Sequence, residues 1–347
     1  MDLTEEITGL NDEINRLFTG FSVDLDALFE MLLSGNVSGA LQMCFQNLAQ
    51  AFQGEIKSFK SMIVMLLCVG ILAALLMNLT DLFENKQIAD IGFYFVYLFL
   101  ILLLLRIFGV VTDTAQVLIS DMLVFMKLFM PVYFLAVGAA GGVTTGLLYY
   151  QFILTVIYVM EAALSAFLMP LIKVYIFLAF MNGLWTEEKL QMMLDLLKRV
   201  IGYILKIFFA VITGISMIQS MITPVIESVK MSALQKTISL IPGIGNVSDS
   251  VAELVIGSAV LIKNSAGVLA VLLLTLLCAL PALKIWILAM LLKFSAALTG
   301  IVSDKRITSC MDRVGEGSLL VLRIVLTAGG LFLIMIAIAA MTTNRGF

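Results

Sequence analysis

Residues 170–176 read Pro-Leu-Ile-Lys-Val-Tyr-Ile, and residues 281–287 repeat this pattern as Pro-Ala-Leu-Lys-Ile-Trp-Ile. The same offset of 111 residues separates Pro131 from Pro242, so four of the five prolines fall into two matching pairs. Duplicated units of this length are typical of membrane proteins. We therefore predict an internal repeat of about 111 residues, with an acidic amphipathic helical head outside the bilayer at 1–60, membrane repeats at 61–170 and 171–281, and a partial third repeat with the last span at 282–347.

The composition of the chain is that of a membrane protein. Hydrophobic residues make up 61% of the sequence and charged residues 13%, and the mean hydropathy is +1.09. A soluble domain carries about 25% charged residues, roughly twice as many. We predict an all-α fold, namely a polytopic α-helical membrane protein that combines helical hairpins with amphipathic interfacial helices.

The first 56 residues differ from the rest because they hold nine acidic residues and a single basic one, Arg16. Apolar residues follow one helix seam through this acidic head, in steps of three and four: Leu3, Ile7, Leu10, Ile14, Leu17 and Phe21. The seam either packs against the other head helices or binds a partner protein. Because the chain opens with acidic residues, we expect that a signal segment was removed or that the first span serves as one.

Apolar stretches predict about seven membrane spans. Four of them are single crossings: Met62–Leu79, Ile91–Val111, Ile201–Ile222 and Leu319–Met341.

Two further apolar stretches, Leu147–Leu184 and Ala266–Leu298, are too long for one crossing, so we expect each to fold back as a helical hairpin. Prolines and glycines mark the candidate hinges or breaks in the chain: Pro131, Pro170, Pro242, Pro281, Gly142 and Gly245.

The segments between the spans are more polar. Thr112–Met130 mixes polar and apolar residues, which is compatible with a helix in the interface and with a helix that crosses while facing protein. Thr186–Val200 has the pattern of an amphipathic surface helix. Ser303–Ser318 is rich in charge, and we expect a loop there.

Four charged residues lie inside or beside apolar stretches and are candidate intramembrane polar residues: Glu161, Asp121, Lys173 and Lys284. Glu161 lies in the middle of its stretch, where a charge is most costly, so it is the strongest functional candidate and should face protein or water. A purely structural role, as the partner of a lysine or a backbone group, is the alternative. The two lysines can extend their stems to reach the lipid headgroups.

The residue types argue against most enzyme classes. Histidine is absent, which removes the commonest general base and metal ligand, and the four cysteines show no Cys-x-x-Cys spacing. We therefore expect no enzyme activity, no catalytic residue, no metal site and no cofactor, and we expect no nucleic acid as a partner.

Residues 241–249 read Ile-Pro-Gly-Ile-Gly-Asn-Val-Ser-Asp, and Gly257-Ser258, Leu261–Asn264, Gly267 and residues 281–285 follow. With these motifs the sequence resembles the stage III sporulation protein AE family of endospore-forming bacteria over residues 60–347. The resemblance implies a multi-pass protein in the mother-cell membrane that surrounds the forespore. It also implies partners from the same operon and from the forespore, in a trans-envelope channel or secretion-like complex, and it supplies no catalytic residue.

Two functions fit these observations. The resemblance favours a structural or channel-associated subunit of a sporulation complex, with membrane lipid and other stage III envelope proteins as partners and with homo-oligomerisation open. The repeat and the broken helices fit, as the alternative, a secondary transporter for a small solute. A transporter needs intramembrane charges that converge on one cavity, whereas an assembly subunit needs a partner surface such as the head seam.

Overall fold

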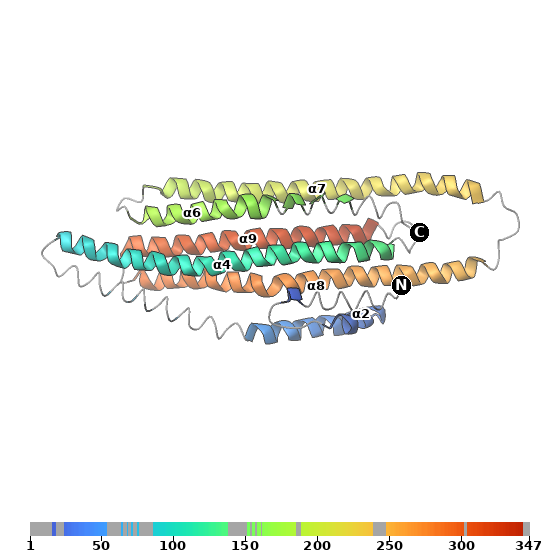
Figure 1. The fold of residues 1–347 in the computed structure, drawn as a ribbon, viewed down its shortest axis with the longest axis horizontal. Helices are drawn as coiled ribbons and strands as arrows, with labels where there is room; N and C mark the ends of the chain where they lie inside the picture. The colour runs from blue at the N-terminus through green and yellow to red at the C-terminus, as the bar shows by residue number, and fades with distance from the viewer. Residues whose placement is uncertain are drawn as a thin grey trace.

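The computed structural model is a long bundle whose helices run nearly along one common axis (Figure 1). The structure describes residues 16–18, 24–53, 64, 68, 71, 75, 86–137, 151–152, 155–156, 158–160, 162–184, 189–238, 248–301 and 304–342. These residues are helical apart from short turns and caps, and no strand occurs among them. The predicted all-α fold is therefore confirmed.

Among the described residues, four long helices and several shorter helical elements run along the bundle. They are α2 (Leu25–Leu33), α4 (Lys86–Val137), the π-helix η2 (Ala162–Leu168), α6 (Met169–Asn182), α7 (Gln191–Ile238), α8 (Ser248–Thr299) and α9 (Lys305–Thr342). The short helix α2 packs against α8 on the outside of the bundle. Residues 37–53, which follow α2, are also helical.

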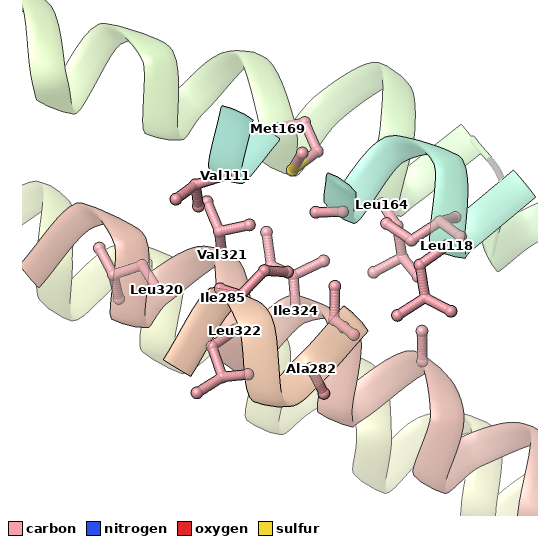
Figure 2. Packing of buried hydrophobic residues seen from close by; sticks show 14 of the residues in the cluster. Val111, Leu118, Leu164, Met169, Ala282, Ile285, Leu320, Val321, Leu322 and Ile324 are labelled. Atoms are coloured by element: carbon pink, nitrogen blue, oxygen red, sulfur yellow. The ribbon is translucent and has the colours of Figure 1, made fainter. Parts of the chain in front are cut away.

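Helix α9 lies at the centre, because it contacts α4, α6, α7 and α8. Its apolar side chains are buried along most of its length, and those of Val321 and Ile324 are fully covered. Around them pack Val111 of α4 and Ile285 of α8 (Figure 2). Between helices inside a membrane, such contacts stabilise through close van der Waals packing rather than through transfer from water.

The helices are much longer than a membrane is thick. Both α4 and α8 have 52 residues, which corresponds to about 78 Å at 1.5 Å per residue, against about 30 Å of hydrocarbon core. Four helical segments are long and apolar enough to span a membrane: Ile91–Pro131, Tyr158–Asn182, Asn264–Thr299 and Lys305–Ala337. They fit a multi-pass membrane protein. The predicted span Met62–Leu79 lies outside the described residues, apart from four isolated positions.

The two proline stretches that suggested the repeat lie in different surroundings. Pro170 occupies the first turn of α6, directly after η2, whereas Pro281 lies inside α8, which continues to Thr299. The expected hairpin at Ala266–Leu298 is therefore wrong, and Tyr158–Asn182 is one candidate span rather than two arms. A membrane helix tolerates an interior proline because neighbouring groups satisfy the freed carbonyl. The internal repeat is not confirmed.

Other expected boundaries are also absent. Pro131 lies inside α4, which ends only at Val137, and Thr112–Met130 is the middle of this helix. From Gln191 on, the predicted surface helix continues without interruption into the span after it, as the single helix α7. Three of the candidate hinges, Pro242, Gly142 and Gly245, lie outside the described residues.

The charged segment Ser303–Ser318 is not a loop, because α9 begins at Lys305. Asp304 precedes the helix, and its carboxylate accepts the backbone N–H of Arg306 at 2.7 Å, as a helix-capping residue does. The prediction failed because the charges were assigned to solvent, whereas most of them pair with neighbouring helices.

Candidate functional site: an ionic network at one end of the bundle

Three helix ends meet at the same end of the bundle: the end of α6 and the beginnings of α7 and α9 (Figure 1). The side chain of Asn182, which is buried at the end of α6, accepts the backbone N–H of Leu190 at 2.8 Å. This bond holds the turn that leads into α7. The first turns of α7 therefore lie beside α6 and the first turns of α9.

Glu316 of α9 is the centre of the network. Its Oε1 accepts a hydrogen bond from Lys198 Nζ of α7 at 2.6 Å, and its Oε2 accepts one from the Tyr175 hydroxyl of α6 at 3.1 Å. Arg313, one turn earlier on α9, donates to Asp195 of α7 at 2.8 Å and to Glu316 Oε2 at 3.3 Å. Two cations and two carboxylates thus join three helices.

The inner members of this network are shielded from the surroundings. The side chains of Arg313 and Glu316 are only 13% and 17% exposed, and Tyr175 is fully buried. A shielded charge costs several kcal/mol unless it is paired and hydrogen-bonded. Here both conditions are met, because each carboxylate faces a cation and the bonds are charge-assisted.

Two further contacts tie the remaining helices to the same part of α9. Lys293 of α8 pairs with Asp312 at 2.7 Å. The guanidinium of Arg306 lies 3.5 Å from the ring centroid of Phe93 on α4 and is held there by Asp304. Helices α4, α6, α7 and α8 are therefore all joined to the first twelve residues of α9 by polar or cation–π contacts.

Two glycines on α9 make these close approaches sterically feasible. A Cβ atom added to Gly315 would lie 2.8 Å from Lys293 Cγ, and one added to Gly317 would overlap the side chain of Ile176 on α6. Small residues at helix contacts allow backbones to approach closely inside membranes. The network and the glycines thus act at the same crossing.

The arrangement is suited to holding helices rather than to catalysis. The charged groups of the network are bonded to one another, so none is presented as a nucleophile or general base. Within the described ranges, no group of three His, Cys, Asp or Glu residues could hold a metal ion. The chemistry that the network supports is a charge-balanced clamp between α6, α7 and α9.

The predicted intramembrane residues are not part of this network. Lys173 is exposed on α6, Asp121 on α4 and Lys284 on α8 are half-buried, and Glu161 lies outside the described residues. Of the head seam, only Leu17 is described, and it is half-buried against the core. The other seam residues lie outside the described ranges: Leu3, Ile7, Leu10, Ile14 and Phe21.

Sequence reasoning missed all five network residues. Tyr175 belongs to the segment that suggested the repeat, whereas Asp195 and Lys198 lie in the predicted surface helix. Arg313 and Glu316 were assigned to a loop, although their spacing of three residues is that of neighbours on one helix face. That spacing, together with Gly315 and Gly317 between apolar residues, was the available signal for a packed helix.

Comparison with known proteins agrees with the motifs in the sequence. The profile of the family described as stage III sporulation protein AE matches residues 23–343. A relative with the name stage III sporulation protein AE, from Bacillus subtilis (strain 168), is 23% identical over 285 residues, which cover 78% of this chain and 71% of the relative. No solved structure matches this chain. Because the family profile covers most of the sequence, the chain belongs to the stage III sporulation protein AE family.

Proposed function

We propose that this chain is a channel-associated assembly subunit of a trans-envelope sporulation complex, located in the mother-cell membrane around the forespore. Its proposed partners are membrane lipid, other stage III envelope proteins and further copies of the chain. Family membership supports the sporulation context. The role of assembly subunit is supported by the distribution of exposed apolar residues along the bundle.

Large apolar side chains are exposed along far more of the bundle than one bilayer can cover. On α4 they begin at Ile91, and Phe95 is 72% exposed; on α7 they extend from Met192, which is 89% exposed, to Ile218. A hydrocarbon core is about 30 Å thick, whereas the exposed apolar side chains of α4 extend from Ile91 to Val124, about 50 Å along the helix. Apolar surface that lipid does not cover needs protein to cover it. This observation carries the proposal.

The ionic network favours the same function. It fastens α6, α7 and α9 to one another without leaving a reactive group. A subunit that must keep its shape while other proteins bind gains from such a clamp, whereas an enzyme or a carrier needs unpaired groups at a binding site.

The test is site-specific photocrosslinking in sporulating cells of an endospore-forming host. A photoreactive phenylalanine analogue at Met192 should form crosslinks to other stage III envelope proteins, because this side chain is almost fully exposed. The matched control is Leu194, which is two residues away on the same helix and is buried. If positions Met192, Phe95, Phe294 and Ile301 all crosslink to lipid alone, the chain is not an assembly subunit.

The head seam gives a second test. The double substitution Leu10→Asp and Ile14→Asp should abolish recovery of the complex by pull-down while residues 60–347 still insert and fold, because the bundle is held by its own contacts. Equal recovery after this change removes the seam from the proposed interface.

A secondary transporter remains the competing function, and one observation counts against it. A transporter needs charges that converge on a buried site, yet Lys173 is exposed on the outside of α6. Solute uptake by the purified chain in proteoliposomes, with no other protein present, would favour the transporter.

A further inference from the structure

Basic residues surround the bundle at one level along its axis. Helices α4, α6, α7, α8 and α9 each contribute at least one of them, and all are exposed except Lys284, which is half-buried: Arg106, Lys173, Arg199, Lys206, Lys284 and Arg323. We call this set the basic belt. Of the described acidic side chains, only Asp113 is exposed at the same level.

The contacts of α9 fix this level for two neighbouring helices. On α7, Lys198 pairs with Glu316, and Phe209 lies beside Gly330, so Lys206 falls about level with residue 326. On α8, Lys293 pairs with Asp312, and Cys278 lies beside Gly329. Lys284, which lies between these two contacts, is therefore level with Arg323 to within about one helical turn.

The same reasoning places α6 and α4. Ile176 lies against Gly317, which places Lys173 within about one helical turn of the level of Arg323, on the side of the ionic network. On α4, Phe93 lies under Arg306 and Met122 lies beside Gly329, so Arg106 is about 10 Å from the level of Arg323. The backbone positions of the belt residues thus spread over a band along the bundle axis. Their long side chains can bend toward a common plane, which brings the charged groups closer to one level.

Aromatic side chains with polar edges accompany the belt. Trp286 lies two residues from Lys284 and is 47% exposed, and the ring of the exposed Tyr203 lies 6.0 Å from Lys206 Nζ. Trp and Tyr, together with Lys and Arg, are enriched where a membrane meets water. The belt therefore has the chemistry of a headgroup contact.

On one side of the belt, three helices lack charge over the same interval. Residues 207–226 of α7 and 264–283 of α8 are 20 residues each without Asp, Glu, Lys or Arg, and α9 has none from residue 324 to Thr342. Twenty residues correspond to about 30 Å, the thickness of a hydrocarbon core. On the other side, α6 ends nine residues after Lys173, about 14 Å away, and the ionic network occupies the space.

We propose that the basic belt contacts the anionic lipid headgroups of one membrane surface. The hydrocarbon core then encloses the charge-free interval of α7, α8 and α9, and the ionic network lies outside the bilayer. The exposed apolar face of α4 from Ile91 to Leu105 also lies outside, where only protein can cover it.

Helix α2, which packs against α8 beside the end of this interval that is distant from the belt, exposes Asp26 and Glu30 together with its capping residue Asp24 (Figure 1). Helix α4 is a second element that carries charge within the interval. It carries Asp121, which is half-buried, and Lys127, whose Nζ lies 5.3 Å from the ring centroid of Tyr158. Charges at this depth face protein or water rather than lipid. The Lys127–Tyr158 contact shows that this face of α4 lies against the segment that precedes η2.

The first test measures depth with single tryptophans. In a background with Trp185→Phe and Trp286→Phe, the full chain carries either Phe209→Trp or Phe95→Trp and is placed in nanodiscs of phosphatidylcholine and phosphatidylglycerol. Both phenylalanines are exposed, and they lie on opposite sides of the belt: Phe209 is three residues beyond Lys206, and Phe95 is eleven residues before Arg106. Lipids brominated in mid-chain should quench Phe209→Trp strongly and leave Phe95→Trp unchanged.

Quenching of Phe95→Trp by the same lipids, with or without quenching of Phe209→Trp, overturns the proposal. Ile215→Trp and Phe294→Trp repeat the comparison at exposed positions on the two sides in case either first variant does not fold. This readout requires no partner protein, so its failure is independent of the proposed assembly function.

The second test addresses headgroup charge. With Trp185→Phe alone, the remaining Trp286 should be quenched more by brominated phosphatidylglycerol than by brominated phosphatidylcholine, and most by lipids brominated near the headgroup. Arg106→Gln with Lys206→Gln should remove this preference. The control, Lys189→Gln with Lys305→Gln, removes the same charge from exposed sites near the beginnings of α7 and α9, away from the belt, and should keep it. The absence of a preference in the unmodified belt, or equal loss in both pairs, overturns the proposal.

Discussion

Arg313 and Arg323 both belong to α9, but Arg313 is shielded and paired, whereas Arg323 is exposed. Their substitution should therefore affect the free energy of unfolding to different extents. Arg313→Gln should lower the free energy of unfolding by about 2–3 kcal/mol, because it leaves the carboxylate of Asp195 without its cation and removes one of the two cations of Glu316. Arg323→Gln, at an exposed position ten residues later, should change it by less than about 0.5 kcal/mol. Thermal unfolding in detergent measures both, and equal effects would mean that the network does not stabilise the fold.

A pair of glycines gives a similar contrast. Gly317→Ala should destabilise the protein by about 1–3 kcal/mol, because the added methyl group would overlap Ile176 and separate α6 from α9. Nothing lies within 4 Å of a Cβ added to Gly202 on α7, so Gly202→Ala should be neutral or stabilising by up to about 1 kcal/mol. The same unfolding measurement decides, and a destabilising Gly202→Ala would contradict this account of the packing.

At the scale of residues, the candidate intramembrane positions remain a prediction. Asp121 and Lys284 are half-buried in the bundle, whereas Lys173 is exposed. The network could not be predicted, because its residues come from α6, α7 and α9 and meet only after these helices have packed. A sequence shows that a charged residue lies among apolar residues, but it does not show which distant residue pairs with that charge.

At the scale of elements, the two proline positions lead to a direct prediction. Pro281→Ala should raise the free energy of unfolding by about 1–3 kcal/mol, because it restores a backbone donor inside α8. Pro170→Ala should change it by less than about 1 kcal/mol, since proline is well tolerated in the first turn of a helix. Unfolding curves of the two variants, measured side by side, give the answer. Equal effects would support the structural equivalence that a repeat requires.

The existence of helices was predictable from composition and periodicity, whereas their ends were not. Prolines were expected to end segments, yet α4 and α8 continue through Pro131 and Pro281. Charge was expected to mark a loop after Ser303, yet the capping by Asp304 and the pairing with α7 and α8 make that segment helical. In both cases tertiary contacts outweigh the local preference.

At the scale of the whole molecule, the central position of α9 predicts a gradient of stability. Its backbone amides from Ile307 to Phe332 should exchange hydrogen most slowly, because this helix is enclosed by α4, α6, α7 and α8. Those of α2, which packs only on the outside, should exchange fastest among the described helices. Hydrogen exchange followed by mass spectrometry measures this order, and an α9 that exchanges as fast as α2 would contradict the arrangement.

The unequal lengths of the helices have a mechanical consequence. Helices α7 and α8 both continue past the end of α9 and project from the bundle as two antiparallel arms that lie apart from each other (Figure 1). Each arm acts as a lever whose pivot is the packed region around α9. A small tilt of the packed helices moves the tip of a projecting arm by a larger distance. Conversely, a displacement at the tip moves the packed helices by a much smaller distance and with a larger force.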